Sequence, residues 1–158
     1  PFMIIVNRQT PNHPEKNIPA EYWNEMIREF SKFVGMGGDF EVFTFGDPLK
    51  HPPAVHVSDF QTFCSMVANP NCRGVIAPCT GGVYPIFFTG HAKSKLLIVD
   101  QNGLVEKHGD SPSFYNNCIN FTETTGMVLG HLPDPQSLAI DIRDFIDLKP
   151  SRLSRDKW

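Results

Sequence analysis

A pair of glycines after a short apolar run supplies the residues of this sequence best suited to chemistry. Residues 74–77 are mostly apolar, and Thr80, Gly81 and Gly82 follow them in a Cys-Thr-Gly-Gly turn. Glycine lets backbone N–H groups approach a ligand closely, and the N-terminus of a following helix attracts anions. The turn therefore predicts a phosphate-binding site, to which Thr80 adds a hydroxyl. In the alternative interpretation, the two glycines only form a tight connection between a strand and a helix.

Two other loops are expected to reach the same place as this turn. Ser58 and Asp59 follow one short apolar run, and a polar loop that contains Gln101 and Asn102 follows another. In a parallel sheet the carboxyl ends of the strands lie at one edge, and ligands of open α/β folds bind there. We therefore expect the three loops to border one site. Ser58 is also a good N-cap for the helix that is expected next.

The hydrophobic pattern predicts strands and helices in alternation. Residues 2–6 form a continuous apolar run, which is typical of a strand buried on both faces. In residues 20–34 the apolar side chains recur every three or four positions, which indicates an amphipathic helix. This alternation predicts an α/β fold with a doubly wound, mostly parallel, Rossmann-like sheet. The expected strands span residues 2–6, 40–45, 54–57, 74–77, 96–99 and 127–129, and the expected helices span residues 20–34, 59–68, 83–91, 114–123 and 135–148.

Length, charge and hydropathy limit the classes of protein to consider. The 158 residues are enough for one domain, which we expect over residues 1–148, with a peripheral basic tail over residues 149–158. A formal net charge of -3 gives no indication of nucleic-acid binding. No apolar run approaches the roughly 18 residues of a membrane span, and the first residues are typical of a strand rather than of a signal peptide.

The cysteines and histidines lack the spacing of metal ligands. The four cysteines form no Cys-x-x-Cys pair, and the six histidines are scattered. We therefore expect no metal and no cofactor, and we expect buried or half-buried free thiols in the reducing cytoplasm. Cys79 is the alternative case, because a place beside a helix N-terminus can lower the pKa of a thiol and make it reactive. The cysteines are Cys64, Cys72, Cys79 and Cys118.

Six segments of the chain, taken in order, resemble one known family. They are FEVFTFG, HPPAVHVSDFQTF, RGVIAPCTGG, KSKLLIVDQNG, FYNNCINF and ETTGMVLG. They resemble the carboxyl-terminal, donor-binding domain of GT-B glycosyltransferases, in particular the peptidoglycan-type N-acetylglucosaminyltransferases. The resemblance spans residues 2–148 and rests on order and spacing more than on any invariant motif. This sequence departs from the family pattern at three places. The family has a Glu where this chain has Val83-Tyr84-Pro85, and Gly-Lys-Pro where it has Gly90-His91-Ala92. An acidic-Gln or His-Gln pair of the family is replaced by Ser111-Pro112-Ser113.

The resemblance implies a nucleotide-sugar donor and a place for each part of it. A GT-B enzyme closes two Rossmann-like domains over its substrate, and the acceptor site and the usual base come from the amino-terminal one. A partner domain or subunit is therefore implied, and the catalytic residues stay unknown. The resemblance implies that the diphosphate is cradled by Thr80, Gly81 and Gly82. It implies that the base is bordered by Val57, Ser58 and Asp59. Towards the ribose or the sugar it places Gln101 or Asn102, with Asn116 or Asn117.

Three functions stay open at the level of the sequence. The first is the donor-binding half of a glycosyltransferase that transfers a hexosyl or N-acetylhexosaminyl group. The second is a non-catalytic domain of the same fold that binds a nucleotide or another protein. The third is a tautomerase that uses Pro1 as its base, since the opening PFMIIVN resembles that of such enzymes. A simple dinucleotide-binding domain is not favoured, because no Gly-x-Gly-x-x-Gly fingerprint is present.

Overall fold

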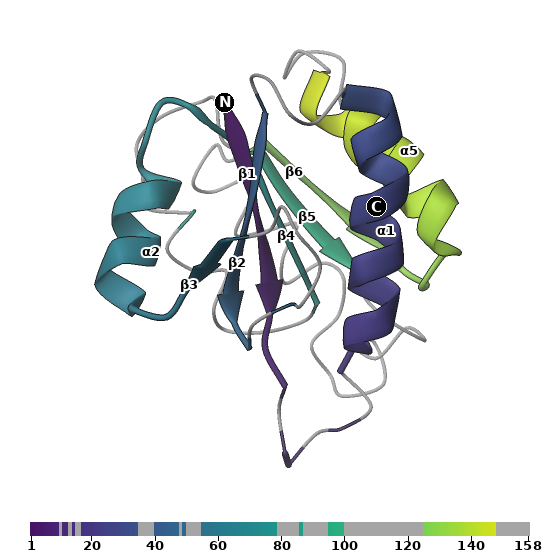
Figure 1. Cartoon of the computed structure of the whole chain (residues 1–158), viewed down its shortest axis with the longest axis horizontal. Helices are drawn as coiled ribbons and strands as arrows, with labels where there is room; N and C mark the ends of the chain where they lie inside the picture. The colour runs from purple at the N-terminus through teal and green to yellow at the C-terminus, as the bar shows by residue number, and fades with distance from the viewer. Residues whose placement is uncertain are drawn as a thin grey trace.

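Within the residues that the structure describes, six parallel strands form one sheet (Figure 1). The computed structural model describes residues 1–9, 11–12, 14, 17–34, 40–47, 49, 55–78, 86, 95–99 and 125–147. The order of the strands across the sheet is β3-β2-β1-β4-β5-β6. The strands are β1 (Phe2–Asn7), β2 (Glu41–Gly46), β3 (Val55–Val57), β4 (Cys72–Pro78), β5 (Lys95–Val99) and β6 (Thr125–Leu129).

The chain winds outward across the sheet in both directions from its centre. β1 pairs with β2 on one side and with β4 on the other. β3 continues the sheet beyond β2, and β5 and β6 continue it beyond β4. This is the strand order of the Rossmann fold, so the prediction of a doubly wound, parallel α/β fold is confirmed. The direction of winding reverses between β1 and β4.

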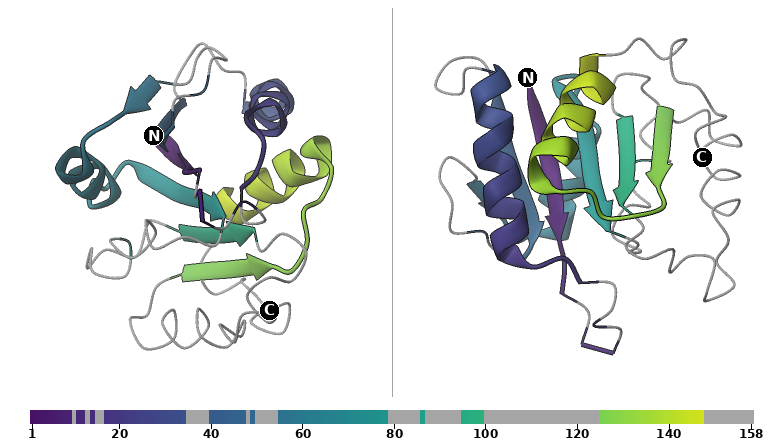
Figure 2. Two further views of the ribbon diagram at one scale, coloured as in Figure 1. Left: turned by 90° about the horizontal axis from the view of Figure 1, so that it is seen from below. Right: turned by 90° about the vertical axis from the view of Figure 1, so that its right-hand side faces the viewer.

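Helices cover both faces of the sheet, which explains the continuous apolar runs of its central strands. The helices α1 (Ala20–Val34) and α5 (Pro135–Asp147) lie together on one face, and α2 (Phe60–Val67) lies on the other (Figures 1 and 2). Successive side chains of a strand point to opposite faces. Met3 and Ile5 therefore join the cluster under α1 and α5, whereas Ile4 and Val6 join the cluster under α2.

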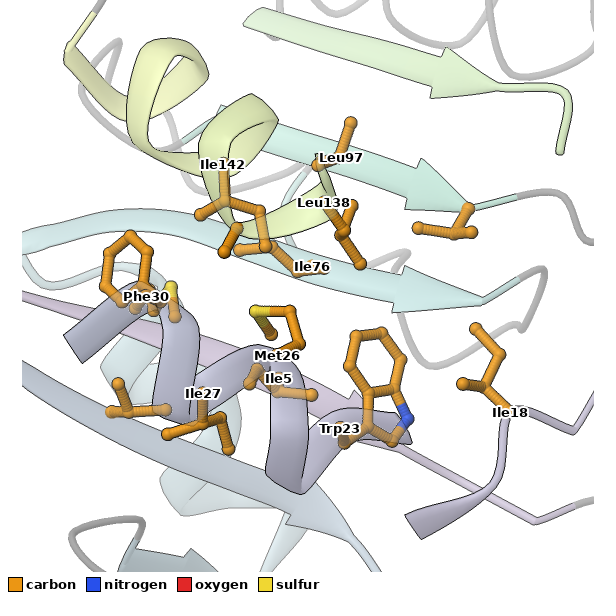
Figure 3. Packing of buried hydrophobic residues seen from close by; sticks show 14 of the residues in the cluster. Ile5, Ile18, Trp23, Met26, Ile27, Phe30, Ile76, Leu97, Leu138 and Ile142 are labelled. Carbon is orange, nitrogen blue, oxygen red and sulfur yellow. The ribbon is translucent and has the colours of Figure 1, made fainter. Parts of the chain in front are cut away.

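Large side chains from two helices fill the core under α1 and α5. Trp23 and Phe30 of α1 are fully buried there, as are Leu138 and Ile142 of α5 (Figure 3). Their spacings of seven residues in α1 and four in α5 fit the helical period that the sequence predicted. Burial of this apolar stripe, rather than intrinsic helix propensity, is what stabilises the two helices on the sheet.

The boundaries of the elements agree with the sequence to within one or two residues. The helix expected over residues 20–34 is confirmed at both ends. β4 begins earlier than predicted, at Cys72, because Phe2 of β1 pairs with that residue. The prediction that Ser58 caps the next helix is wrong: the N-cap is Asp59, whose carboxylate accepts a hydrogen bond from the Thr62 N–H. The expected helices 83–91 and 114–123 and the tail 149–158 lie outside the described residues.

The described part of the chain also bears on membranes, thiols and metals. None of its helices is long and apolar enough to cross a membrane. Cys64 is half-buried and Cys72 is buried, and neither is in a disulfide, as the sequence predicts. Cys79 and Cys118 lie outside the described residues. No three His, Cys, Asp or Glu side chains in the described part come together as a metal site would require.

Candidate functional site at the carboxyl edge of the sheet

The carboxyl ends of three adjacent strands bring distant parts of the chain together. β1 ends at Asn7, β2 at Gly46 and β3 at Val57. Because these strands are parallel neighbours, their ends lie at one edge of the sheet, where α1 and α2 also begin (Figure 1). Ligands of open α/β sheets bind outside this edge, which we call the carboxyl edge. It is the candidate functional site.

Asn7, Gln9 and Asp47 form a hydrogen-bonded network across the ends of β1 and β2. The Asp47 N–H donates to the Asn7 carbonyl oxygen (2.6 Å), and Asn7 Nδ2 donates to the Asp47 carbonyl oxygen (3.1 Å). The Gln9 N–H donates to Asp47 Oδ2 (2.8 Å). Gln9 Nε2 donates to Asn7 Oδ1 and to the Ile18 carbonyl oxygen, both at 3.2 Å. Asn7 is buried, whereas the side chains of Gln9 and Asp47 are exposed.

Gly46 allows the two strand ends to approach this closely. Its φ of +98° lies in the region that favours glycine. A Cβ atom at this position would lie 2.7 Å from the Asn7 carbonyl oxygen and 3.2 Å from the Arg8 Cα. Both contacts are to backbone atoms, which cannot rotate away. The glycine therefore determines where Asp47 leaves the sheet.

Towards the described residues, the carboxylate of Asp47 uses only part of its capacity to accept hydrogen bonds. A carboxylate offers about four lone-pair positions. Among the described residues, the Gln9 N–H is its donor, at Oδ2. Fixed by its neighbours and exposed, this carboxylate can accept hydrogen bonds from two hydroxyl groups of a ligand. In Rossmann folds that bind a dinucleotide, an acidic residue after the second strand accepts such bonds from a ribose. Asp47 shares that place at the end of β2, although the Gly81-Gly82 pair comes after it in the chain.

Of the predicted site residues that the structure describes, Val57 is the buried last residue of β3, whereas Ser58 and Asp59 lie between β3 and α2. Both are exposed. Asp59 Oδ2 accepts hydrogen bonds from the Thr62 N–H and from Thr62 Oγ1, each at 2.8 Å. These bonds from Thr62 lower the pKa of the Asp59 carboxyl group below its ordinary value. The carboxylate thus accepts a backbone N–H that would otherwise be unpaired at the start of α2. This is a structural role, in addition to the expected contact with a base.

Three aromatic rings pack together where β2, β3 and α2 meet. The rings of Phe45 and Phe63 stack, with centroids 4.2 Å apart and an angle of 7° between the planes. The Phe60 ring lies 6.1 Å from the Phe45 ring and 6.2 Å from the Phe63 ring. Phe45 and Phe63 are buried, whereas Phe60 is 55% exposed. We call these three residues the aromatic cluster.

The first turn of α1 contains a buried hydrogen-bond donor that has no acceptor among the described residues. Trp23 is fully buried, and its Nε1–H makes no hydrogen bond to this part of the chain. Figure 3 shows the nitrogen side of the ring turned towards Ile18, in the segment that leads into α1. The Ile18 carbonyl oxygen itself is bonded to Gln9 Nε2. The region where α1 begins is therefore less completely hydrogen-bonded than the network beside it.

The structure brings together residues that the sequence did not single out. Asn7, Gln9, Asp47 and Phe60 belong to segments that the pattern marked only as strand end, loop or helix. The signal that was present is a polar residue closing an apolar strand, followed by Gly-Asp at the end of the next strand. Seven predicted site residues lie outside the described residues: Thr80, Gly81, Gly82, Gln101, Asn102, Asn116 and Asn117.

Pro1 lies away from this site. It is exposed at the start of β1, so it is at the amino edge of the sheet, opposite the carboxyl edge. Its carbonyl oxygen accepts a hydrogen bond of 3.1 Å from the Glu41 N–H, at the start of β2. A base at Pro1 would therefore work apart from the network and the aromatic cluster.

Comparison of the chain with protein-family models, with curated proteins and with solved structures gave no match.

Proposed function

We propose that this chain is a nucleotide-binding domain whose ligand is a nucleotide-sugar. The observation that carries the proposal is an exposed, hydrogen-bonded carboxylate, Asp47, at the end of β2 in a sheet of Rossmann order. A carboxylate at this place suits the hydroxyl groups of a ribose. The resemblance to the donor-binding domain of GT-B glycosyltransferases supports the same ligand class.

The segment after β1 favours a nucleotide-sugar over a dinucleotide. Dinucleotide-binding folds place a glycine-rich turn between the first strand and the first helix. Here residues 8–19 contain three prolines and no glycine. The Gly-Gly pair of this sequence, Gly81 and Gly82, comes after β4 in the chain instead, and we propose that the diphosphate binds there.

In the proposed reaction, this domain holds the donor while a second domain or subunit supplies the acceptor. An oxygen of the acceptor attacks the anomeric carbon, and the bond from that carbon to the diphosphate oxygen breaks. Backbone N–H groups and a helix N-terminus at the glycine turn would stabilise the charge on the departing diphosphate. A domain that binds the nucleotide without transferring its sugar is the alternative within the same proposal.

The proposal is tested by a thermal-shift titration of the chain with UDP, GDP, dTDP and their sugars. A ligand present at 100 times its Kd stabilises the folded state by about 2.7 kcal/mol, which raises the Tm by about 5–10 °C at this size. We expect a saturable rise for at least one nucleotide. No rise with any of them at millimolar concentration would contradict the proposal.

A variant of Asp47 tests whether this carboxylate contacts the ribose. Asp47→Asn keeps the shape of the side chain but removes its charge, so we expect binding of the preferred ribonucleotide to weaken about tenfold. The wild type should prefer a ribonucleotide to its 2′-deoxy form, and Asp47→Asn should lose that preference. Asp144→Asn is the matched control, because Asp144 is exposed on α5 and pairs with Arg143. An unchanged preference in Asp47→Asn would exclude Asp47 as the ribose contact.

A further inference from the structure

We infer that the exposed ring of Phe60 is the surface on which the base of the bound nucleotide stacks. The inference rests on the proposed function and adds to it a residue and a mode of recognition. Phe60 is the first residue of α2, and the residue remains 55% exposed although two buried rings adjoin its ring.

The aromatic cluster holds the Phe60 ring in a fixed place. The stacked pair of Phe45 and Phe63 lies beneath it, and Phe63 is one turn further along α2. The Asp59 carboxylate fixes the start of the helix through the Thr62 N–H. A ring that is held from one side and open on the other loses little conformational freedom when a second ring stacks on it.

The position of the ring relative to Asp47 suits the two parts of one nucleoside. Phe45, whose ring centroid is 6.1 Å from that of Phe60, precedes Asp47 by two residues. In the sheet, Phe45 pairs with Val57, which precedes Phe60 by three residues. The proposed contacts for ribose and base therefore follow two adjacent, paired strands, β2 and β3, at the carboxyl edge, and the ribose and the base are directly bonded to each other.

The chemistry of the cluster predicts how the base is recognised. Every base has a π-face, so stacking on an aromatic ring contributes affinity with little discrimination between bases. Ser58 and Gln61, which are both exposed and flank Asp59 and Phe60 in the chain, provide the polar groups near this ring. We therefore expect diphosphates of different bases to bind within about tenfold of one another, since the shared stacking accounts for much of the affinity.

The test compares Phe60 with an exposed phenylalanine elsewhere. Calorimetric Kd values are measured for UDP and GDP with the wild-type chain and with Phe60→Ala, Phe60→Leu, Phe60→Tyr and Phe33→Ala. Phe33 is the control because it is exposed on α1 and packs under Arg143 rather than in the aromatic cluster. Removing a stacked ring should weaken binding about tenfold in Phe60→Ala and Phe60→Leu. Phe60→Tyr, which keeps an aromatic face, and Phe33→Ala should bind as the wild type does.

Each outcome separates this inference from the proposed function. If the wild type binds a nucleotide and Phe60→Ala binds it equally well, the inference is wrong and the proposed function stands. If Phe60→Leu matches the wild type, the contact is apolar rather than aromatic stacking, which also overturns the inference. Equal weakening in Phe33→Ala would show a general loss of stability instead of a lost contact, which also overturns the inference. If the wild type binds neither UDP nor GDP, both the inference and the proposed function fail for these ligands.

Discussion

Replacing Gly46 by alanine should destabilise the whole domain, because the new methyl group meets backbone on two sides. A side chain held at a φ of +98° costs about 1–3 kcal/mol in strain. The added Cβ would also lie 2.7 Å from the Asn7 carbonyl oxygen, so the ends of β1 and β2 must separate. That oxygen accepts the Asp47 N–H, and loss of this hydrogen bond costs about 1 kcal/mol more. We expect Gly46→Ala to lower the free energy of unfolding by about 3 kcal/mol.

Urea unfolding followed by far-UV circular dichroism measures this change, and the chain offers a matched control. Apart from its chain neighbours, no atom of the described residues lies within 4 Å of a Cβ built on Gly130, and its φ is outside the positive region. Gly130→Ala should therefore stay within about 0.5 kcal/mol of the wild type. The Tm of Gly46→Ala should fall by about 10 °C. Equal stability of the two alanine variants would refute the reasoning about the close approach of β1 and β2.

Two further predictions concern the starts of the helices. Hydrogen bonds lower the pKa of two carboxyl groups from 3.8: those from Thr62 to Asp59 at the start of α2, and those from Ser137 to Asp134 at the start of α5. The contribution of these bonds to stability is therefore present above pH 3.8 and is lost as the pH falls through the lower folded pKa values. An acid titration of stability should therefore be flatter for the double variant Asp59→Asn, Asp134→Asn than for the wild type, and an unchanged slope would count against this assignment. Tyr22→Phe removes the hydrogen bond from the Tyr22 hydroxyl to the Pro133 carbonyl oxygen and should cost about 1 kcal/mol in urea. Burial is the main cause that raises the pKa of Tyr22, so the wild type should lose stability above the ordinary tyrosine pKa of 10, and Tyr22→Phe should lose less.

The N-cap of α2 shows what local sequence can predict and what it cannot. The sequence predicted a helix after residue 58 and an N-cap at Ser58, but Asp59 performs that role. Both residues are good caps, and the choice depends on which backbone N–H groups are left free. That depends on where the turn between β3 and α2 closes, which is decided by the packing of Phe63 and Val67 on the sheet.

The sequence by itself determined the class of fold and the course of α1, because both depend on local periodicity. Continuous apolar strands require cover on both faces, and the stripe of Trp23, Met26, Ile27 and Phe30 allows one orientation of α1. Because strands and helices alternate along the chain, the sheet is expected to be parallel.

Only the tertiary structure decided which loops meet. Asn7 and Asp47 are 40 residues apart in the chain, and nothing local to either residue predicts that the two form hydrogen bonds. Their contact depends on β2 pairing with β1 in register, so that Asn7 lies opposite Gly46. The exposure of Phe60 likewise depends on Phe45 and Phe63 filling the space beneath it. A binding site of this kind is assembled by strand order and register, which are properties of the whole sheet and not of any one segment.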